Sequence, residues 1–389
     1  MNFTIPFAGR SQNYTSEEIN EVINVMQSAE TLTQGKYLES FQTKFCNYAN
    51  ANHAFAVNNG TSAIELSAQL CQFNSGDEVI IPSHTYTASA YPFLKKGAKI
   101  VWADIDLKTR VVTAETLEKC ITPNTKAIVV VHLYGFCADM PKIVLMAKRH
   151  NLLIIEDAAQ ALGSRIDNQM AGTYGDLGIV SFHSHKNITT LGEGGMLIVK
   201  NKKLASIIPM LRHNGHCEFN FERENYWSPA MSNVDLAELN DEVIWPNNYC
   251  LGEVECALGI KLLDRIDRIN EEKKKRAIYF IDEISRYDQL YFHREDSLRH
   301  NYHLLVGQVL HGNRDILIQR MAEAGVQCVV QYYPLNRYDL YKRSGYGYAD
   351  CPNADTFFDN MISFPFQYMM SEDTFMRLVK ITKNVLNSM

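Results

Sequence analysis

Residues that could do chemistry follow several short apolar runs of the chain. Lys186 follows one run, Glu156 and Asp157 end another, and Gly60–Ser62 (Gly-Thr-Ser) follows a third and opens a helical pattern. Backbone N–H groups and hydroxyls at a helix start could bind an anion. Acids at the end of a buried strand are costly unless they are paired or used. Taken singly, each motif also has an ordinary explanation, as a solvated lysine, ion-paired acids or a helix cap.

Together these groups suit pyridoxal phosphate (PLP). This cofactor needs a lysine for a Schiff base, a carboxylate beside its pyridine nitrogen and a cup for its phosphate. Asp157 precedes Lys186 by 29 residues, about one strand–connection–strand step, so both could reach one ring. The glycine-rich turn 192–195 after Lys186 permits a close approach of the backbone. Tyr86 follows another strand end, where its ring could stack on the cofactor or pack in the core.

The elements that must position these residues alternate between strand-like and helix-like segments in the first two-thirds of the chain. The predicted helices include 16–28, which opens with a capping box at Thr15 and Glu18, and 140–150. Seven short, mostly apolar runs predict strands buried on both faces of a sheet: 54–57, 78–81, 99–103, 127–132, 152–156, 179–183 and 196–199. This alternation predicts an α/β fold with a mainly parallel sheet between layers of helices.

The pattern changes after about residue 250, which predicts a large α/β domain over 1–250 and a smaller α+β domain over 251–389. In the second part the sequence predicts one or two long helices over 253–285, strands at 302–310 and 326–332, and a closing helix at 373–386. The segment 213–246 shows little periodicity. A connection that long is usually functional or interfacial.

Composition excludes several classes of protein. The chain has 389 residues, 46% hydrophobic and 21% charged, with a net charge of −6, which is typical of a globular protein and does not favour a nucleic-acid partner. No apolar stretch approaches the roughly 18 residues of a membrane span, and the N-terminus lacks the pattern of a secretion signal. Nine cysteines without a C-x-x-C pair predict neither a disulfide framework nor a zinc or other metal site. We therefore expect a cytoplasmic protein.

Several motifs, in order along nearly the whole chain, resemble the sugar aminotransferase family named after DegT, DnrJ and StrS, which are PLP enzymes of fold type I. The segments that carry the resemblance are 59–63, 76–80, 132–135, 156–160, 181–186, 192–195, 246–249 and 253–259. It implies a large domain with a seven-stranded, mainly parallel sheet and a smaller C-terminal domain.

The resemblance also implies roles for individual residues. Lys186 carries PLP and moves the proton, and Asp157 pairs with the pyridine nitrogen. Asn248 reaches the phosphate in the neighbouring subunit, so the active unit is expected to be a homodimer. The other implied cofactor contacts are Gly60, Thr61, Ser62 and Ser181 at the phosphate, Gln160 near the ring hydroxyl, and Tyr86 on the ring face.

The activity implied by the resemblance is a two-stage amino transfer. Glutamate gives its amino group to the cofactor and leaves as 2-oxoglutarate, and a keto-sugar, expected to be nucleotide-linked, then accepts the group. Transfer to a smaller acceptor, such as a keto-inositol or a phosphorylated ketone, stays open. Two further alternatives are a sugar dehydratase, in which a histidine replaces the lysine, and a PLP-binding regulator without turnover. Lys186 argues against the former, and the lack of a visible DNA-binding module argues against the latter.

Three features depart from the family pattern. Cys250 stands where an arginine is common, which leaves the holder of the donor's carboxylate or the substrate's phosphate undefined. The 213–246 segment is long and could reshape the acceptor site or the dimer surface, with Arg223, Tyr226, Trp227 and Trp245 as its marked residues. His185 stands where many relatives have a small residue; it could contact substrate, join proton transfer or act only as a hydrogen-bonded neighbour.

A late stretch, 331–337, resembles the substrate-facing segment of the family. It contributes Tyr332 as a candidate substrate contact and Arg337 as a candidate clamp for an anionic group. An arginine at that place could equally be solvated.

Overall fold

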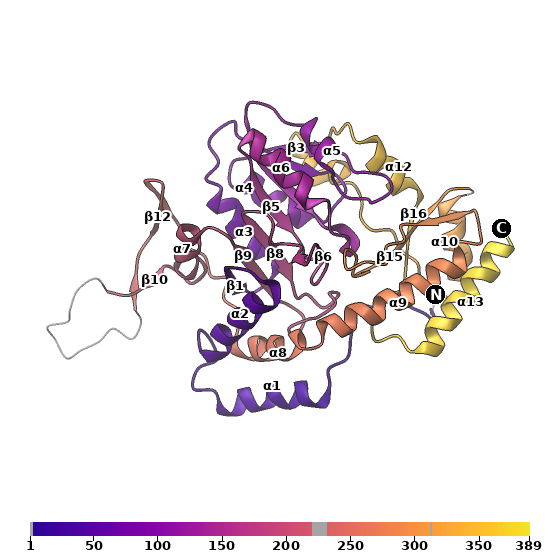
Figure 1. Ribbon diagram of the computed structural model, residues 1–389, viewed down its shortest axis with the longest axis horizontal. Helices are drawn as coiled ribbons and strands as arrows, with labels where there is room; N and C mark the ends of the chain where they lie inside the picture. The colour runs from indigo at the N-terminus through magenta and orange to yellow at the C-terminus, as the bar shows by residue number, and fades with distance from the viewer. Residues whose placement is uncertain (1–2, 220–231, 312) are drawn as a thin grey trace.

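The computed structural model describes residues 3–219, 232–311 and 313–389. A seven-stranded sheet lies at its centre, in the order β1-β9-β8-β5-β4-β2-β3 (Figure 1). Its strands are β1 (His53–Val57), β2 (Glu78–Pro82), β3 (Lys99–Ala103), β4 (Thr125–Val131), β5 (Leu153–Asp157), β8 (Leu177–Ser181) and β9 (Gly195–Val199). These are the seven predicted runs, with shifts of up to two residues at their ends. The α/β fold with a mainly parallel seven-stranded sheet is confirmed.

Strand direction brings the chemically interesting residues to one edge of this sheet. Strands β3, β2, β4, β5 and β8 pair in parallel, and β9 pairs antiparallel to both β8 and β1. Six strands therefore run in one direction, and their carboxyl ends meet where ligands of such sheets bind. Asp157 ends β5, Ser181 ends β8, and β9 begins at the same edge with Gly195.

The helix that follows β1 begins at that edge. Helix α3 (Gly60–Leu70) is buried along almost its whole length and packs against β8 and β9. Its N-cap is Asn59, whose side-chain oxygen accepts the backbone N–H of Ser62 at 2.8 Å. Its buried residues include polar as well as apolar side chains, so the helix shows no single apolar face.

Further helices surround the sheet in Figure 1. They are α1 (Ser16–Ser28), α2 (Lys36–Ala49), α4 (Tyr91–Lys95), α5 (Ala114–Glu118), α6 (Met140–His150) and α7 (Lys202–Arg212), with short 3-10 turns η1 (Thr87–Ser89) and η2 (Leu133–Gly135) and a small hairpin of β6 (Arg165–Ile166) and β7 (Gln169–Met170). The predicted capping box of α1 is present, since Thr15 and Glu18 bond each other's backbone N–H groups.

The C-terminal part is built on a three-stranded antiparallel sheet. Its elements are α8 (Glu253–Leu263), α9 (Ile266–Ile284), β14 (Leu290–Phe292), β15 (Leu305–Val309), α10 (Arg314–Glu323), η3 (Leu335–Arg337), α11 (Asp339–Arg343), α12 (Pro352–Asn360), β16 (Met361–Phe364) and α13 (Glu372–Asn387). The predicted helices over 253–285 and 373–386 and the strand within 302–310 are confirmed. Figure 1 shows α9 running from beneath the central sheet to α13 at the C-terminus.

The predicted strand at 326–332 is wrong. This segment makes only two isolated bridges, Val326 with Ile5 and Val329 with Ser363. Its two partners belong to different parts of the chain, so no continuous ladder forms. Beyond Val329, the Gln331 carbonyl and the Tyr332 hydroxyl bond side chains beside the central sheet instead.

Two hydrophobic clusters hold the molecule together. The larger surrounds the central sheet, and the smaller gathers α9, α10, α13 and the three-stranded sheet, with Ile5 from the N-terminal segment. Helix α8 belongs with the larger cluster, because it packs against α1 and α2. A division into domains at 1–250 and 251–389 stays a prediction.

The described parts of the 213–246 segment contain two short antiparallel strand pairs beside α7, at the left of Figure 1. Their strands are β10 (His216–Cys217) with β11 (Asn233–Val234) and β12 (Ala237–Leu239) with β13 (Glu242–Ile244). Of the marked residues, Trp245 is 72% exposed. Arg223, Tyr226 and Trp227 lie outside the described residues.

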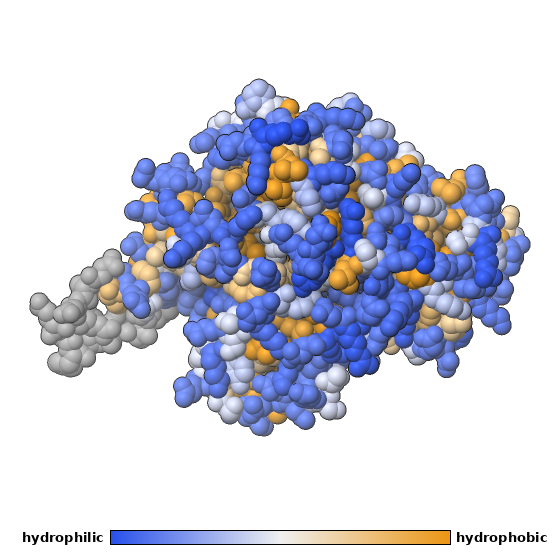
Figure 2. Space-filling model, viewed as in Figure 1, coloured by the Kyte–Doolittle hydropathy of each residue, from blue (hydrophilic) through white to orange (hydrophobic). Residues whose placement is uncertain are grey.

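The surface and the thiols carry few special features. On the face shown in Figure 2, hydrophilic residues predominate and hydrophobic residues form separate patches. Among the described residues, no helix is both long and apolar enough to cross a membrane, and no cluster of three or more metal-ligating side chains occurs. All nine cysteines are free thiols.

Candidate active site

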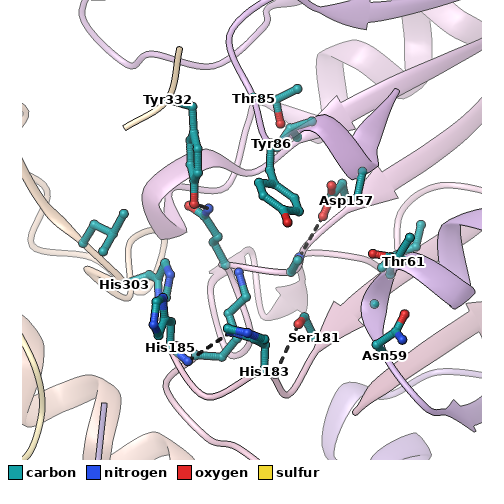
Figure 3. Close-up of a pocket in the computed structure, with 18 of the residues that line it drawn as sticks. Asn59, Thr61, Thr85, Tyr86, Asp157, Ser181, His183, His185, His303 and Tyr332 are labelled. Atoms are coloured by element: carbon teal, nitrogen blue, oxygen red, sulfur yellow. Dashed lines mark hydrogen bonds between the residues drawn. The ribbon is translucent and has the colours of Figure 1, made fainter. Parts of the chain in front are cut away.

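A cavity of about 690 Å³ opens at the edge where the strand ends meet. Figure 3 shows Asn59, Thr61 and Ser181 on one side of it, and His185 and His303 on the opposite side. The predicted site residues that line it are Gly60, Thr61, Ser62, Tyr86, Asp157, Gln160, Ser181, His185, Lys186 and Tyr332. Residues from four strand ends and the late 331–332 stretch therefore share one cavity.

The start of α3 forms the anion-binding end of the cavity. The N–H groups of Gly60 and Thr61 precede the hydrogen-bond ladder of the helix, so they are available to a ligand. Two glycines allow the close packing here. A Cβ on Gly60 would lie 3.1 Å from the Cβ of Ser181, and one on Gly195 would lie 2.5 Å from the carbonyl carbon of Asn59. This cradle of N–H groups and hydroxyls fits a phosphate.

Asp157 is buried at the end of β5 and held in one orientation. Its Oδ2 accepts the Ser89 hydroxyl at 2.6 Å, and its Oδ1 accepts the N–H of Ala159 at 3.1 Å. These two contacts hold the carboxylate in the orientation in which it could pair with a protonated pyridine nitrogen. Sequence reasoning missed Ser89, which precedes Asp157 by 68 residues and stands in no motif.

Glu156, next to Asp157, does structural work instead. Its carboxylate accepts the backbone N–H groups of Gly172, Tyr174 and Gly175 at 2.6–2.8 Å and pairs with His132 Nε2 at 2.8 Å. It is fully buried and does not line the cavity. Strand alternation explains the difference, because neighbouring side chains point to opposite faces of the sheet.

Lys186 follows β8 on a tight turn. Its N–H donates to the His183 carbonyl at 2.8 Å, and its own carbonyl accepts the Ser11 hydroxyl. Burial lowers the pKa of its amine from 10.5 to about 8, although the charge of Asp157 acts in the opposite direction. A substantial fraction of the amine is therefore neutral near physiological pH, as a nucleophile or general base requires.

Gln160 and Tyr332 form a polar wall across from Asp157. Gln160 Nε2 donates to the Tyr332 hydroxyl at 2.9 Å, and its Oε1 accepts the N–H of Tyr134 at 2.7 Å. The ring of Tyr86 lies edge-on to that of Tyr332, with centroids 5.9 Å apart. Tyr86 is 55% exposed, so its ring is free to cover a ligand in the cavity (Figure 3).

His185 contributes an imidazole beside the lysine. Its ring lies 5.0 Å from that of His183, and both line the cavity. Burial and the neighbouring charges of His183 and Lys186 lower its pKa below the ordinary value of 6.5. The ring is therefore mostly neutral near pH 7, and one of its nitrogens can accept a hydrogen bond.

Two predicted site residues do not line the cavity of this chain. Asn248 is exposed and bridges His213 through its backbone, so a role toward a second subunit stays a prediction. Arg337 is paired with Asp355 and lies 3.6 Å from Asp359. These carboxylates already neutralise its charge, so this position does not support the role of a substrate clamp.

The cavity also contains residues that sequence reasoning missed. Lys273 comes from α9, His303 and Leu304 precede β15, and Phe7 and Ser11 come from the N-terminal segment. None of them stands in a motif near the strand ends. Only the folding of the C-terminal part and the N-terminus over the sheet edge could bring them here.

The site combines a lysine of lowered pKa, an oriented carboxylate and a helix start that fits a phosphate, all at one edge of this sheet. This combination defines a PLP-dependent transferase. Residues 12–383 match the model of the DegT/DnrJ/EryC1/StrS aminotransferase family. The chain belongs to this family and is a PLP-dependent aminotransferase.

Similarity to individual proteins extends over most of the chain. A GDP-perosamine synthase of Caulobacter vibrioides is 33% identical over 82% of each chain. The L-glutamine:2-deoxy-scyllo-inosose aminotransferase of Streptomyces kanamyceticus is 33% identical over 68% of this chain and 61% of its own. The structure of Spr1654 from Streptococcus pneumoniae in its PLP form superposes with a TM-score of 0.85, at 25% identity, over 100% of this chain and 99% of the other.

Proposed function

We propose that this aminotransferase moves the amino group of an amino acid, glutamate, onto a keto-sugar linked to a nucleotide. The observation that carries the proposal is the joint placement of Lys186 and Asp157 in one cavity of about 690 Å³, large enough for more than the cofactor. The similarity to a GDP-perosamine synthase over 82% of the chain supports a sugar nucleotide as the acceptor. Glutamate as donor rests on the family resemblance.

Bound PLP supplies an electron sink that stabilises negative charge on the carbon next to the transferred nitrogen. The α3 start and Ser181 hold its phosphate, and Asp157 keeps a proton on its ring nitrogen. Lys186 Nζ, with its lowered pKa, removes and returns the proton at the carbon that carries the amino group. Tyr86 and Tyr332, whose rings contact each other at the cavity wall, would help to cover the bound cofactor.

The two stages would use the same cavity in turn. Glutamate enters, leaves its amino group and departs as 2-oxoglutarate, and the keto-sugar then accepts the group. We further propose a homodimer, in which the exposed Asn248 contacts the cofactor phosphate in the neighbouring subunit, and a cytoplasmic location. The dimer would explain why this residue stands outside its own cavity.

A smaller acceptor is the second candidate. The similarity to a 2-deoxy-scyllo-inosose aminotransferase favours a keto-inositol as the alternative, and a phosphorylated ketone belongs to the same group. The shared fold does not decide between the two acceptors. The two candidates predict different substrates but the same first stage.

The test is the absorbance spectrum of the PLP-loaded protein before and after L-glutamate. We expect a visible band that shifts to shorter wavelength as the amino group is transferred, and no such shift in Lys186→Ala. Nucleotide-linked keto-sugars, keto-inositols and phosphorylated ketones are then compared for their ability to restore the band. A wild-type band that ignores glutamate but responds to another amino acid would replace the donor, and no response to any amine would overturn the proposal.

A further inference from the structure

The cavity contains one cation that the mechanism above does not use. Among its described lining residues, Lys186 and Lys273 are the two that carry a lysine or arginine side chain. Lys273 lies on α9, which is far in sequence from the strands of the central sheet, and it is only 2% exposed. A buried lysine normally has a carboxylate partner, because an uncompensated charge is costly to bury.

Lys273 has no such partner. Its Nζ donates to Asn187 Oδ1 at 3.0 Å and to the His303 carbonyl at 2.8 Å, and lies 5.3 Å from the ring centre of Phe366. In the ranges 3–219, 232–311 and 313–389, no ion pair joins it to an acid. One of its three N–H donors is thus left for a ligand. Burial lowers the pKa of its amine to about 7, and an arriving anion would favour the charged form.

The position of Lys273 separates it from the phosphate site. It bonds the backbone of His303, which lies across the cavity from Asn59 and Thr61 in Figure 3. The α3 start serves the cofactor phosphate at the other end. A second anion in the cavity would therefore meet Lys273.

Two arginines that could be considered for such an anion, Arg212 and Arg337, already have partners. Cys250 replaces the arginine common in the family, and its thiol donates to the carbonyl of Arg212. The guanidinium of Arg212 is itself buried and donates to Gln42 Oε1 and the Ala56 carbonyl. Arg337 is paired with Asp355 outside the cavity.

We propose that Lys273 binds a carboxylate of the amino donor in the active-site cavity. The inference rests on the proposed function, because an amino-acid donor always brings a carboxylate into the cavity with its amino group. Asn187 and the His303 carbonyl orient the amine, and its remaining N–H and its charge meet the carboxylate. The same contact would hold the keto-acid product until it leaves.

The test uses glutarate, a dicarboxylate that has no amino or keto group and cannot react. Binding of glutarate to the PLP-loaded protein is measured by titration calorimetry for wild type, Lys273→Met and the control Lys275→Met. Lys275 lies on the same helix with a side chain that is 71% exposed. We expect Lys273→Met to raise the Kd by at least about tenfold, as the loss of a charge-assisted hydrogen bond does, and Lys275→Met to change it less than about twofold.

The state of each variant is checked by its PLP band and its melting temperature. If Lys273→Met loses the cofactor, Lys273→Gln replaces it, since an amide keeps a donor for Asn187 without the charge. In the Lys273 variants, the loss of kcat/KM should be at least about tenfold larger for glutamate than for 1-phenylethylamine, a donor without a carboxylate.

The outcomes separate this inference from the proposed function. Unchanged glutarate affinity in both Lys273 variants would overturn the carboxylate site. An equal loss of rate with glutamate and 1-phenylethylamine would also overturn it, because Lys273 would then act through Asn187 on the neighbouring Lys186 rather than on the donor. A wild-type protein that binds glutarate through Lys273 but does not transfer nitrogen from glutamate would support the site and contradict the donor.

Discussion

The hydroxyl of Ser89 donates a hydrogen bond of 2.6 Å to Oδ2 of Asp157, the carboxylate proposed to pair with the ring nitrogen of the cofactor. Both side chains are buried. The bond joins the 3-10 turn η1 to the end of β5 and leaves the carboxylate with little freedom to rotate. The role proposed for Asp157 therefore depends on a residue that touches neither cofactor nor substrate in the expected mechanism.

Replacing Asp157 should reduce the first stage strongly. Asp157→Ala removes the charge that keeps the ring nitrogen protonated, and we expect the rate of glutamate conversion to fall by about 10²–10³. Ser89→Ala leaves the carboxylate in place with one donor fewer and should cost about tenfold. Single-turnover absorbance measures both. Equal rates in wild type and Asp157→Ala would remove this residue from the catalytic groups.

The lowered pKa of Lys186 predicts the pH dependence of cofactor binding. The neutral amine attacks the aldehyde of PLP, so the rate of appearance of the visible band should rise with pH and level off above about 8. Below this pH the amine is protonated and the rate falls. Rapid mixing of PLP-free protein with PLP gives the profile. A midpoint near the ordinary lysine value of 10.5 would contradict the influence of burial.

Glu156 should matter for stability and not directly for chemistry. Glu156→Gln leaves His132 and the N–H groups of the 172–175 turn incompletely bonded in the core, and we expect a loss of about 3 kcal/mol in the free energy of unfolding. Urea denaturation measures it. The control Glu118→Gln breaks exposed ion pairs with Arg149 and His150 and should change stability by less than about 0.5 kcal/mol. A stable Glu156→Gln protein would show that the turn finds other partners.

Gly195 should control the affinity for the cofactor phosphate. The added methyl of Gly195→Ala would overlap the backbone of Asn59 and Gly60, so the α3 start must shift and PLP should dissociate about tenfold more easily. Gly97→Ala is the matched control. The φ of +87° at Gly97 disfavours alanine, so this variant too is expected to be strained. No atom lies within 4 Å of the added Cβ, and Gly97 does not line the cavity. The comparison is made by fluorescence titration with PLP, and similar affinities for both variants would exclude the packing argument.

Local sequence determined a large part of the fold. Seven apolar runs predicted the seven central strands, and the Gly-Thr-Ser motif marked the start of α3, because strand burial and helix capping depend on neighbours in the chain. The 326–332 run was the exception. Val326 and Cys328 are buried, but the segment forms only single bridges with Ile5 and Ser363, and burial alone does not make a strand.

The same distinction between local sequence and tertiary structure applies to the candidate site. Lys186, Asp157 and the α3 start were predictable from motifs, because the sheet edge collects whatever follows parallel strands. The separate roles of Asp157 and Glu156, the Ser89 hydrogen bond and the pairing of Arg337 were decided by the tertiary structure. So was the position of Lys273, which no spacing within α9 indicates. These features depend on contacts that the local sequence pattern does not show. For the buried residues among them, the dry interior gives a hydrogen bond or an unpaired charge its largest effect.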